Sequence, residues 1–361
     1  MSTLPYKSYF RPEIDAMQGY VPGEQPKMQK LIKLNTNENP YPPSEKVLQA
    51  LKDLDMKCLR LYPDPLADEL CEMIAARWEI ERNMVIAANG SDDLLTMVFR
   101  AFTSDKLGVS ILDPTYSLYK ILAQMQHAAV TKIQLVGDEF AMPSDILEQA
   151  KNSNLLIITR PNAPTGNSFA KTAMCEICEK FDGVVLIDEA YADFADDNCI
   201  DLVKKYSNVI VSRTFSKSYS LAGMRLGYAV GDARLIDGLY KLKDSYNVDL
   251  VAQTAARAAF GDEENLRKNC EAIKKTRNET CKALQDMGFS IVPSQTNFLF
   301  AAPPDGDGEG YFKALRDEAI IVRYFPGERT GKYVRITIGL PEEMEKVLKA
   351  TKKRYFSQKN A

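Results

Sequence analysis

The sequence predicts an α/β protein in which helices cover both faces of a mainly parallel sheet, followed by a second, smaller α/β unit. Short apolar runs alternate with helical stretches through the middle of the chain, as is typical of parallel sheets. Each run is almost continuously apolar, which indicates strands that are covered on both faces. After about residue 240 the pattern changes to long polar helical stretches, which indicates the second unit.

The composition is that of an ordinary globular protein. The chain has 361 residues, enough for two domains at about 100–200 residues each. It carries 46 Lys and Arg against 49 Asp and Glu, a formal net charge of −3, which argues against a nucleic-acid protein held by bulk positive charge. No apolar run reaches about 18 residues and none follows Lys7, so we expect neither a membrane span nor a secretory signal.

The first two thirds of the chain are expected to supply the arm and the large sheet. Residues 1–45 are rich in Pro and Gly and are expected to form an extended arm. Strands are expected in the apolar runs at residues 84–88, 107–112, 155–159, 184–187, 209–212 and 227–230. Helices are expected at residues 44–54, 65–79, 91–102, 117–125, 144–151 and 170–180.

The second unit is expected to begin with a polar helical region over about residues 233–288. Three apolar segments follow it, FSIVPSQTNFLFA, IIVRYF and YVRITIG, and a charged helix is expected over about residues 341–355. DGDGEG at 305–310 is expected to be a turn or loop. We therefore expect a large domain at residues 46–255, and a small domain made of residues 256–361 together with the arm, residues 1–45.

Histidine and cysteine usage excludes several site types. His127 is the single histidine, so a two-histidine zinc motif is excluded. The seven cysteines are odd in number and scattered, which favours a reducing cytoplasm. Cys175 and Cys178 form a C-x-x-C, which fits either a redox or zinc half-site or two apolar thiols on one helix face. We favour the second reading, because no further pair or nearby histidine completes a site.

Polar loops follow the expected strands, where ligands of open α/β sheets bind. These loops are Asn89–Asp92, Asp113–Tyr116, Arg160–Gly166, Asp188–Tyr191, Arg213–Lys217 and Leu221–Arg225. Each alone also fits a structural role: Asp188 as a helix cap, Lys217 as a surface charge, Arg225 as an ion-pair partner. Their joint occurrence indicates one site.

The side chains in these loops match the needs of pyridoxal 5′-phosphate chemistry. A lysine forms a Schiff base with an aldehyde cofactor, and a carboxylate keeps a pyridine nitrogen protonated. Hydroxyls, an arginine and a helix N-terminus together hold a phosphate. Neither the dinucleotide fingerprint G-x-G-x-x-G nor the phosphate-binding loop G-x-x-x-x-G-K-[ST] occurs in the chain. The sequence therefore favours pyridoxal phosphate over a nicotinamide or nucleoside triphosphate ligand.

Three motifs carry a family resemblance. P-N-A-P-T-G, D-E-A-Y and T-F-S-K-S-Y-S-L-A-G-M-R-L-G resemble the class I/II, fold-type I aminotransferases, and the resemblance extends over nearly the whole chain. GYVPGEQP, LNTNENPYPPS and VRITIG are similar to the histidinol-phosphate aminotransferase branch. The resemblance implies a fold-type I pyridoxal-phosphate-dependent transferase with a mainly parallel seven-stranded sheet between helices, a smaller α/β domain, and a homodimer with active sites at the interface.

The resemblance also implies residue roles. Lys217 would form the Schiff base and shuttle a proton, Asp188 would pair with the ring nitrogen, and Tyr191 with the ring oxygen. These three are the expected catalytic residues. The expected cofactor ligands are Gly90, Ser91, Asp92, Tyr116, Asn162, Asp188, Tyr191, Thr214, Ser216, Lys217, Arg225 and, from the partner subunit, Tyr62. The expected substrate ligands are Tyr20, Asn37, Arg323 and Arg335, and no metal is expected.

One position departs from the family pattern. The family usually has Asn immediately before P-T-G, where it bonds the cofactor and the substrate carboxylate. Here that position is Ala163, with Asn162 before it, so either Asn162 or a water takes the role, or the site is tuned differently. A missing hydrogen bond to a charged group is worth roughly 1.5–3 kcal/mol.

The activity implied by the resemblance is a cytoplasmic step of histidine biosynthesis. It interconverts L-histidinol phosphate and 2-oxoglutarate with imidazole acetol phosphate and L-glutamate, by a ping-pong reaction through an aldimine at Lys217. An aromatic amino-acid aminotransferase and a phosphothreonine decarboxylase share the cofactor site and stay open as alternatives. A non-catalytic binding protein on the same fold is a remote one. No nucleic-acid or membrane partner is expected.

Overall fold

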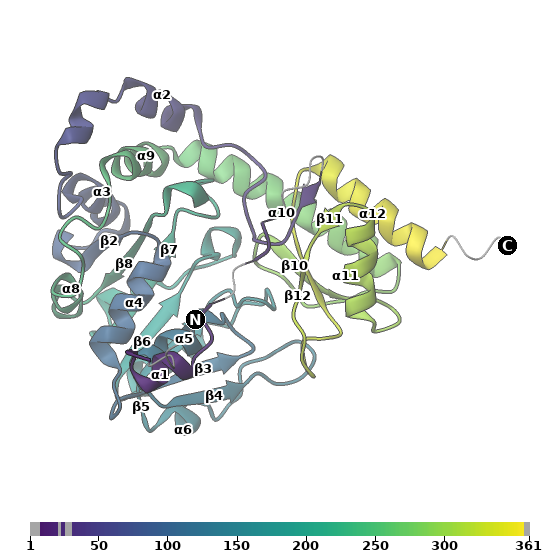
Figure 1. Cartoon of the computed structure of the whole chain (residues 1–361), viewed down its shortest axis with the longest axis horizontal. Coiled ribbons are helices and arrows are strands. Elements are labelled where there is room, and N and C mark those ends of the chain that lie inside the picture. The colour runs from purple at the N-terminus through teal and green to yellow at the C-terminus, as the bar shows by residue number, and fades with distance from the viewer. Residues whose placement is uncertain (1–7, 21–22, 26–30, 357–361) are drawn as a thin grey trace, which may run out of the picture.

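The computed structural model describes residues 8–20, 23–25 and 31–356, arranged as a large sheet-and-helix unit beside a smaller one (Figure 1). The large unit is built on a seven-stranded sheet in the order β2-β8-β7-β6-β5-β3-β4. All neighbours pair in parallel except β8, which runs antiparallel to β2 and β7. The strands are β2 (Val85–Ala88), β3 (Gly108–Asp113), β4 (Val130–Gln134), β5 (Ser153–Thr159), β6 (Val184–Asp188), β7 (Val209–Thr214) and β8 (Gly227–Gly231).

Six of these strands are the apolar runs predicted from the sequence, and β4 is the one the prediction missed. It lies at the edge of the sheet, paired only with β3. In its sequence VTKIQ only Ile133 is buried. Because its other residues are partly or fully exposed, β4 lacks the continuous apolar run that marked the other strands.

Alternation along the strands separates two cores. Leu155 and Ile157 of β5 pack on one face of the sheet with α4, α5 and α8, whereas Leu156 and Ile158 pack on the other with α3, α6, α7 and α9. Successive strand residues point to opposite faces, so a strand with both faces covered must be apolar throughout. Apart from α1 (Pro12–Ala16) in the arm, the α-helices from the first half of the chain are α2 (Glu45–Asp53), α3 (Asp68–Trp78), α4 (Ser91–Phe102), α5 (Leu118–Met125), α6 (Ile146–Ala150) and α7 (Lys171–Lys180).

The predicted polar helical region over 233–288 is three separate helices. They are α8 (Ala233–Tyr240), α9 (Leu250–Phe260) and α10 (Glu263–Asp286). Asp232 and Asp249 cap α8 and α9 by accepting from backbone N–H groups of the first turn. α9 is not polar, since most of its residues are buried against the large unit. The predicted region is therefore helical, but its polar character was wrong for α9.

The smaller unit has a four-stranded antiparallel sheet in the order β12-β13-β10-β9. Its strands are β9 (Ser290–Ile291), β10 (Phe298–Ala302), β12 (Arg323–Tyr324) and β13 (Val334–Thr337). The sheet shares its own apolar core with α10, α11 (Gly308–Asp317) and α12 (Pro341–Phe356). α11 begins inside the predicted loop DGDGEG, because the Asp307 carboxylate accepts from the Gly310 N–H and caps the helix.

The N-terminal arm crosses to the smaller unit. β1 (Ile32–Lys33) pairs in parallel with β11 (Ile320–Ile321), and Leu34 packs in the smaller unit's core. The arm is not extended throughout, because α1 (Pro12–Ala16) contacts α5. Short 3₁₀ turns complete the path: η1 (Met56–Arg60), η2 (Arg82–Met84), η3 (Ala192–Phe194), η4 (Ile200–Lys204) and η5 (Ala222–Met224).

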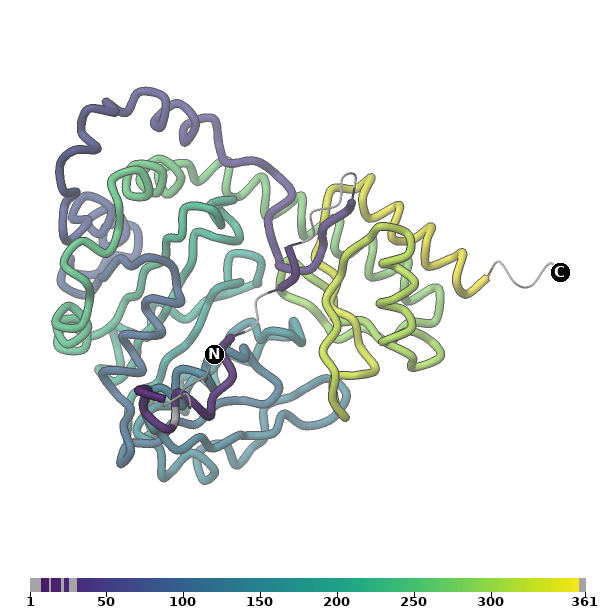
Figure 2. Tube along the Cα trace, in the orientation of Figure 1, coloured from purple at the N-terminus to yellow at the C-terminus, as the bar shows by residue number. Residues whose placement is uncertain are grey.

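The two units also meet through the loop between β12 and β13, which reaches the edge of the large sheet (Figure 2). Arg329 donates to the Asp113 carbonyl (3.3 Å), and Lys332 pairs with Asp138 (2.8 Å). Both contacts lie at the β3–β4 edge. None of the described helices is both long and apolar enough to cross a bilayer.

Candidate active site

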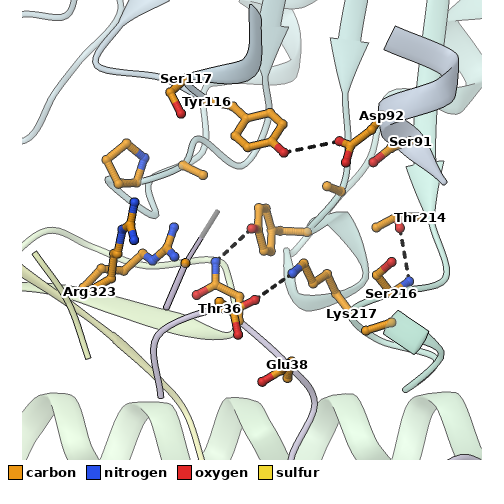
Figure 3. A pocket seen from close by; sticks show the side chains of 18 of the residues that line it. Thr36, Glu38, Ser91, Asp92, Tyr116, Ser117, Thr214, Ser216, Lys217 and Arg323 are labelled. Carbon is orange, nitrogen blue, oxygen red and sulfur yellow. Dashed lines mark hydrogen bonds between the residues drawn. The ribbon is translucent and has the colours of Figure 1, made fainter. Parts of the chain in front are cut away.

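A cavity of about 520 Å³ lies between the two units, at the carboxyl ends of β5, β6 and β7. This is where open α/β sheets bind their ligands. Most of the residues singled out from the sequence line it: Tyr20, Asn37, Ser91, Asp92, Tyr116, Asp188, Tyr191, Thr214, Ser216, Lys217, Arg225, Arg323 and Arg335. Figure 3 shows the side chains of Tyr116 and Asp92 across the cavity from Lys217, with Arg323 at a third side.

Lys217 follows β7 by three residues, and its amine projects into the cavity (Figure 3). Its Nζ donates to the Thr36 carbonyl (3.0 Å). Burial lowers the pKa of Lys217 to about 8, and the positive charges of Arg335 and Arg225 act in the same direction, while Glu38 and Asp92 oppose them. A sizeable fraction of the amine is therefore neutral near physiological pH, as a nucleophile or general base requires.

Asp188 ends β6 and is buried. The Tyr119 hydroxyl donates to its Oδ2 (2.6 Å), and the Ala190 N–H donates to its Oδ1 (3.2 Å). Burial raises the pKa of Asp188, and these hydrogen bonds work against that rise. Tyr119 is a functional candidate that the sequence analysis missed. The spacing in the sequence could have indicated it, because Tyr119 lies three residues after Tyr116. The two rings therefore lie on the same side of the chain where α5 begins.

Tyr191 is held by a chain of hydrogen bonds that ends in the smaller unit. Asn37 Nδ2 donates to the Tyr191 hydroxyl (2.8 Å), and Thr337 Oγ1 donates to Asn37 Oδ1 (3.0 Å). The Asn37 N–H in turn donates to Thr337 Oγ1 (3.1 Å). Burial raises the pKa of Tyr191. Its hydroxyl therefore stays protonated and can donate to a ring oxygen.

An anion cradle lies at the N-terminus of α4. Arg225 reaches Ser216 Oγ (3.3 Å) and Asp92 Oδ2 (3.6 Å) beside the first residues of that helix. A helix N-terminus offers unpaired N–H groups and a partial positive charge to an anion. Gly90, just before the helix, has φ +87°, and a Cβ there would lie 2.9 Å from Arg225 Nη2. The glycine thus lets the guanidinium approach the helix start.

Two further arginines face the cavity from the smaller unit. Arg335 Nη2 donates to the Asn35 carbonyl (2.9 Å), whereas its buried Nε has no hydrogen-bond partner among the described residues. Arg323 lies beside it on the neighbouring strand and lowers the pKa of Arg335 further below the value set by burial. Neither forms an ion pair within the described part of the chain, so both are open to an anionic ligand.

These residues fit pyridoxal phosphate. The α4 cradle suits its phosphate, Asp188 suits a protonated ring nitrogen, and Tyr191 suits the ring oxygen. The Tyr116 ring, on the opposite wall from Lys217, offers a flat apolar surface for the cofactor ring (Figure 3). The unpartnered Arg335 Nε leaves a place for the carboxylate of a substrate.

Three predicted ligands do not line the cavity. Asn162 is fully buried, and its amide donates to the Pro114 carbonyl (3.1 Å) and to Thr165 Oγ1 (2.7 Å). The structure therefore gives Asn162 a role in holding its own turn, and Ala163 faces the cavity in its stead. Gly90 does not touch the cavity, but its missing Cβ leaves room for the Arg225 guanidinium. Tyr62 is 81% exposed and stacks on Tyr246, with ring centroids 4.3 Å apart.

The C-x-x-C motif lies on α7, away from the cavity. Cys178 is buried, and Cys175 packs against the same apolar core. Burial raises the pKa of the Cys178 thiol to about 12, which keeps it protonated and unreactive. These contacts fit the reading of two apolar thiols on one helix face.

Residues 29–350 match the family described as aminotransferase class I and II. The chain belongs to this family. It is 40% identical over 344 residues to histidinol-phosphate aminotransferase 1 of Nostoc sp., covering 95% of this chain and 97% of that protein. It is 42% identical over 341 residues to the histidinol-phosphate aminotransferase of a Geobacter species, covering 94% and 97%.

Structural comparison leads to the same family of folds. The crystal structure of histidinol-phosphate aminotransferase from Sinorhizobium meliloti, in complex with pyridoxal 5′-phosphate, has a TM-score of 0.87 at 22% identity. The match covers 97% of this chain and 98% of that one. The predicted fold-type I architecture is therefore confirmed, as are membership of the aminotransferases and their dependence on pyridoxal phosphate.

Proposed function

We propose that this aminotransferase interconverts L-histidinol phosphate and 2-oxoglutarate with imidazole acetol phosphate and L-glutamate, as a step of histidine biosynthesis. The observation that carries the proposal is the pair Arg323 and Arg335, which face the cavity side by side without ion pairs among the described residues. Two adjacent guanidinium groups repel each other and suit a phosphate dianion better than a single carboxylate. The 40% identity to histidinol-phosphate aminotransferases supports the same choice.

The two substrates use this pair differently. L-Glutamate carries an α-carboxylate, for which the free Nε edge of Arg335 offers a fork. Histidinol phosphate has no carboxylate, so its phosphate takes both arginines, and the Tyr20 hydroxyl at the mouth of the cavity assists. One site thus accepts both donors in turn, as a ping-pong reaction requires.

The residues of the chain divide the work. When bound, pyridoxal phosphate supplies an electron sink for the bond broken at the substrate's α-carbon. Asp188 would hold the proton of the ring nitrogen, and Tyr191 and Asn37 would bind at the ring oxygen. Lys217 Nζ would bind the cofactor covalently and move the proton between the substrate's Cα and C4′ of the cofactor, because among the described residues it is the one lysine that lines this cavity.

We propose that the active form is a cytoplasmic homodimer. An exposed apolar surface supports a second copy as its partner: Met56, Leu59, Leu61, Tyr62 and Tyr246. Tyr62 would reach the cofactor phosphate of the partner subunit, which explains why it lies outside the cavity of its own chain. All seven cysteines are free, which supports a reducing compartment.

A half-reaction tests the substrate. Purified protein with bound cofactor is mixed separately with histidinol phosphate and with phenylalanine, without any keto acid, and its yellow colour is followed. Rapid bleaching by histidinol phosphate alone supports the proposal. Faster bleaching by phenylalanine assigns the protein to the aromatic aminotransferases, and release of CO₂ from phosphothreonine assigns it to the decarboxylases.

The Arg323→Ala variant sharpens this test. It should weaken binding of histidinol phosphate by about tenfold or more, because an ion pair to a phosphate is lost, and change phenylalanine binding much less. Equal effects on both substrates would remove Arg323 from phosphate recognition.

A further inference from the structure

A buried ionic network lies behind the cavity wall and outside the described site. Asp188 ends β6, and Lys217 lies in the loop that follows the neighbouring strand β7. Each is followed by a buried polar residue, Glu189 after Asp188 and Ser218 after Lys217. Neither lines the cavity, so neither is explained by contact with cofactor or substrate.

Arg213 and Asp193 connect these two residues. Arg213 Nε donates to Glu189 Oε2 (2.9 Å), and its Nη1 donates to Asp193 Oδ1 (2.7 Å). The other carboxylate oxygen of Asp193 accepts from the Ser218 hydroxyl. A continuous path, Glu189–Arg213–Asp193–Ser218, thus runs from the residue after Asp188 to the residue after Lys217.

Three of the four members of the network are buried, and the Asp193 side chain is 23% exposed. Glu189, Arg213 and Ser218 are each less than 5% exposed. Although burial disfavours the charge of Arg213, the two carboxylates raise its pKa above the ordinary value, so it stays a cation. Glu189 also accepts from the Cys199 N–H (2.5 Å), and Asn39 Nδ2 donates to the carbonyls of Lys217 (3.0 Å) and Ser218 (3.1 Å).

Packing alone does not require such a network. Apolar residues of similar volume would stabilise this region about as well as the ionic network, because removing charges from water costs a large free energy. What a buried ion network adds is a fixed geometry, because every member must keep its partners. The atoms fixed here are the backbone positions beside the two residues that flank the cofactor.

We propose that Glu189, Arg213, Asp193 and Ser218 are positioning residues that set the Lys217 amine relative to Asp188. The Asp193–Ser218 hydrogen bond is the last contact of this path, because Ser218 is the residue next to Lys217. The inference rests on the proposed role of Lys217 as the reacting amine. It does not depend on which amino acid is the substrate.

Ser218→Ala tests the contact with the smallest change. Ser220→Ala is the matched control, because Ser220 lies in the same loop and its buried hydroxyl has no hydrogen-bond partner among the described residues. The first readout uses cofactor-free protein: the rate at which Lys217 is acetylated as a function of pH, followed by mass spectrometry. We expect the midpoint to rise by at least about half a pH unit in Ser218→Ala, because a released amine gains solvent. Ser220→Ala should match the parent protein.

Turnover supplies the second readout. Ser218→Ala should lower kcat about tenfold and change KM by less than about twofold, because the amine is misplaced while the binding groups stay. Asp193→Asn should act through the same contact, so the double variant should lose no more kcat than Asp193→Asn alone. Thermal unfolding of each variant reports stability separately.

Three results would overturn the proposal. One is a Ser218→Ala protein whose Lys217 acetylation midpoint and kcat both match those of the parent, even if its melting temperature falls. Another is an equal shift in Ser220→Ala, which would indicate a general effect of the loop. The third is full additivity of the Ser218 and Asp193 changes. Because the acetylation measurement contains no substrate, a failure of the histidinol phosphate assignment would not affect it.

Discussion

Lys217 is the residue whose environment matters most for the chemistry. Its depressed pKa comes first from burial and then from Arg335 and Arg225, so the same arginines that bind anions also help to free the amine from its proton. The site thereby couples ligand binding to reactivity, because an anion on Arg335 screens the charge that depresses the pKa.

The pH dependence of cofactor binding follows from this shift. Covalent binding needs the neutral amine, so the rate of association with cofactor-free protein should rise about tenfold per pH unit below about pH 8 and level above it. Arg335→Leu removes a neighbouring positive charge, which favours the ammonium form, so the midpoint should move to higher pH. Stopped-flow absorbance measures the association rate at each pH and so gives the midpoint. Arg323→Leu, from the same cavity, should shift the midpoint less, and the reverse order would contradict the electrostatic account.

Tyr119 offers a second prediction for a single residue. Tyr119→Phe removes a hydrogen bond to the buried Asp188 carboxylate, so the pKa of Asp188 should rise and less of it should be ionised. We expect kcat/KM to fall about tenfold or more, with the acid limb of its pH profile moving to higher pH. Tyr116→Phe is the control, because that hydroxyl donates to Asp92 (3.2 Å) and not to Asp188. An equal displacement of the acid limb in both variants would refute the assignment.

The candidate site was predictable where side chains follow strands. Lys217, Asp188 and Arg225 could be found because strand ends gather at one edge of a sheet, whatever the rest of the fold does. Asn162 shows the limit of this reasoning. A residue beside the expected position was given the missing role, but its amide is used within its own turn, which no spacing reveals. Tyr119 was missed because its partner, Asp188, lies 69 residues away.

At the scale of elements, the start of α4 shows how backbone shape sets up a binding site. Gly90→Ala should weaken cofactor binding by about tenfold, because its Cβ would press on the Arg225 guanidinium at a position with φ +87°. Gly137→Ala is the control for the backbone cost alone, since Gly137 has φ +68° and open space around it. Fluorescence titration with pyridoxal phosphate gives the affinities. Equal losses in the two variants would mean that the contact with Arg225 does not matter.

The elements themselves were predictable when one physical signal dominated. Buried parallel strands such as β5 have no polar face, so their apolar runs stand out. The edge strand β4 was missed, and the helix α9 was predicted to be polar although it is buried, because each depends on its neighbours: β4 on pairing with β3, and α9 on the sheet face that covers it. Such tertiary burial is not contained in local periodicity.

At the scale of the whole molecule, the proposed dimer can be tested by mixing two inactive variants. Lys217→Ala should lose at least about 10³-fold in turnover, and Tyr62→Ala should bind cofactor weakly. Refolding them together should restore roughly a quarter of the parent activity, because a mixed dimer has one site with both residues intact. Activity no higher than the sum of the two separate variants would place Tyr62 outside the partner's site.

The arm that carries Asn37 has a consequence for synthesis in the cell. Asn37 is fixed by Thr337, 300 residues later, and β1 pairs with β11. A ribosome delivers the arm 300 residues before the Thr337 that anchors it, so the arm must wait without its partner while the intervening chain is made. A polypeptide interrupted before β13 would carry Lys217 but neither Arg335 nor an anchored Asn37, and would therefore lack part of the environment that lowers the pKa of this lysine. The unfinished chain is thus expected to keep the Lys217 amine largely protonated and unreactive until the smaller unit completes the cavity.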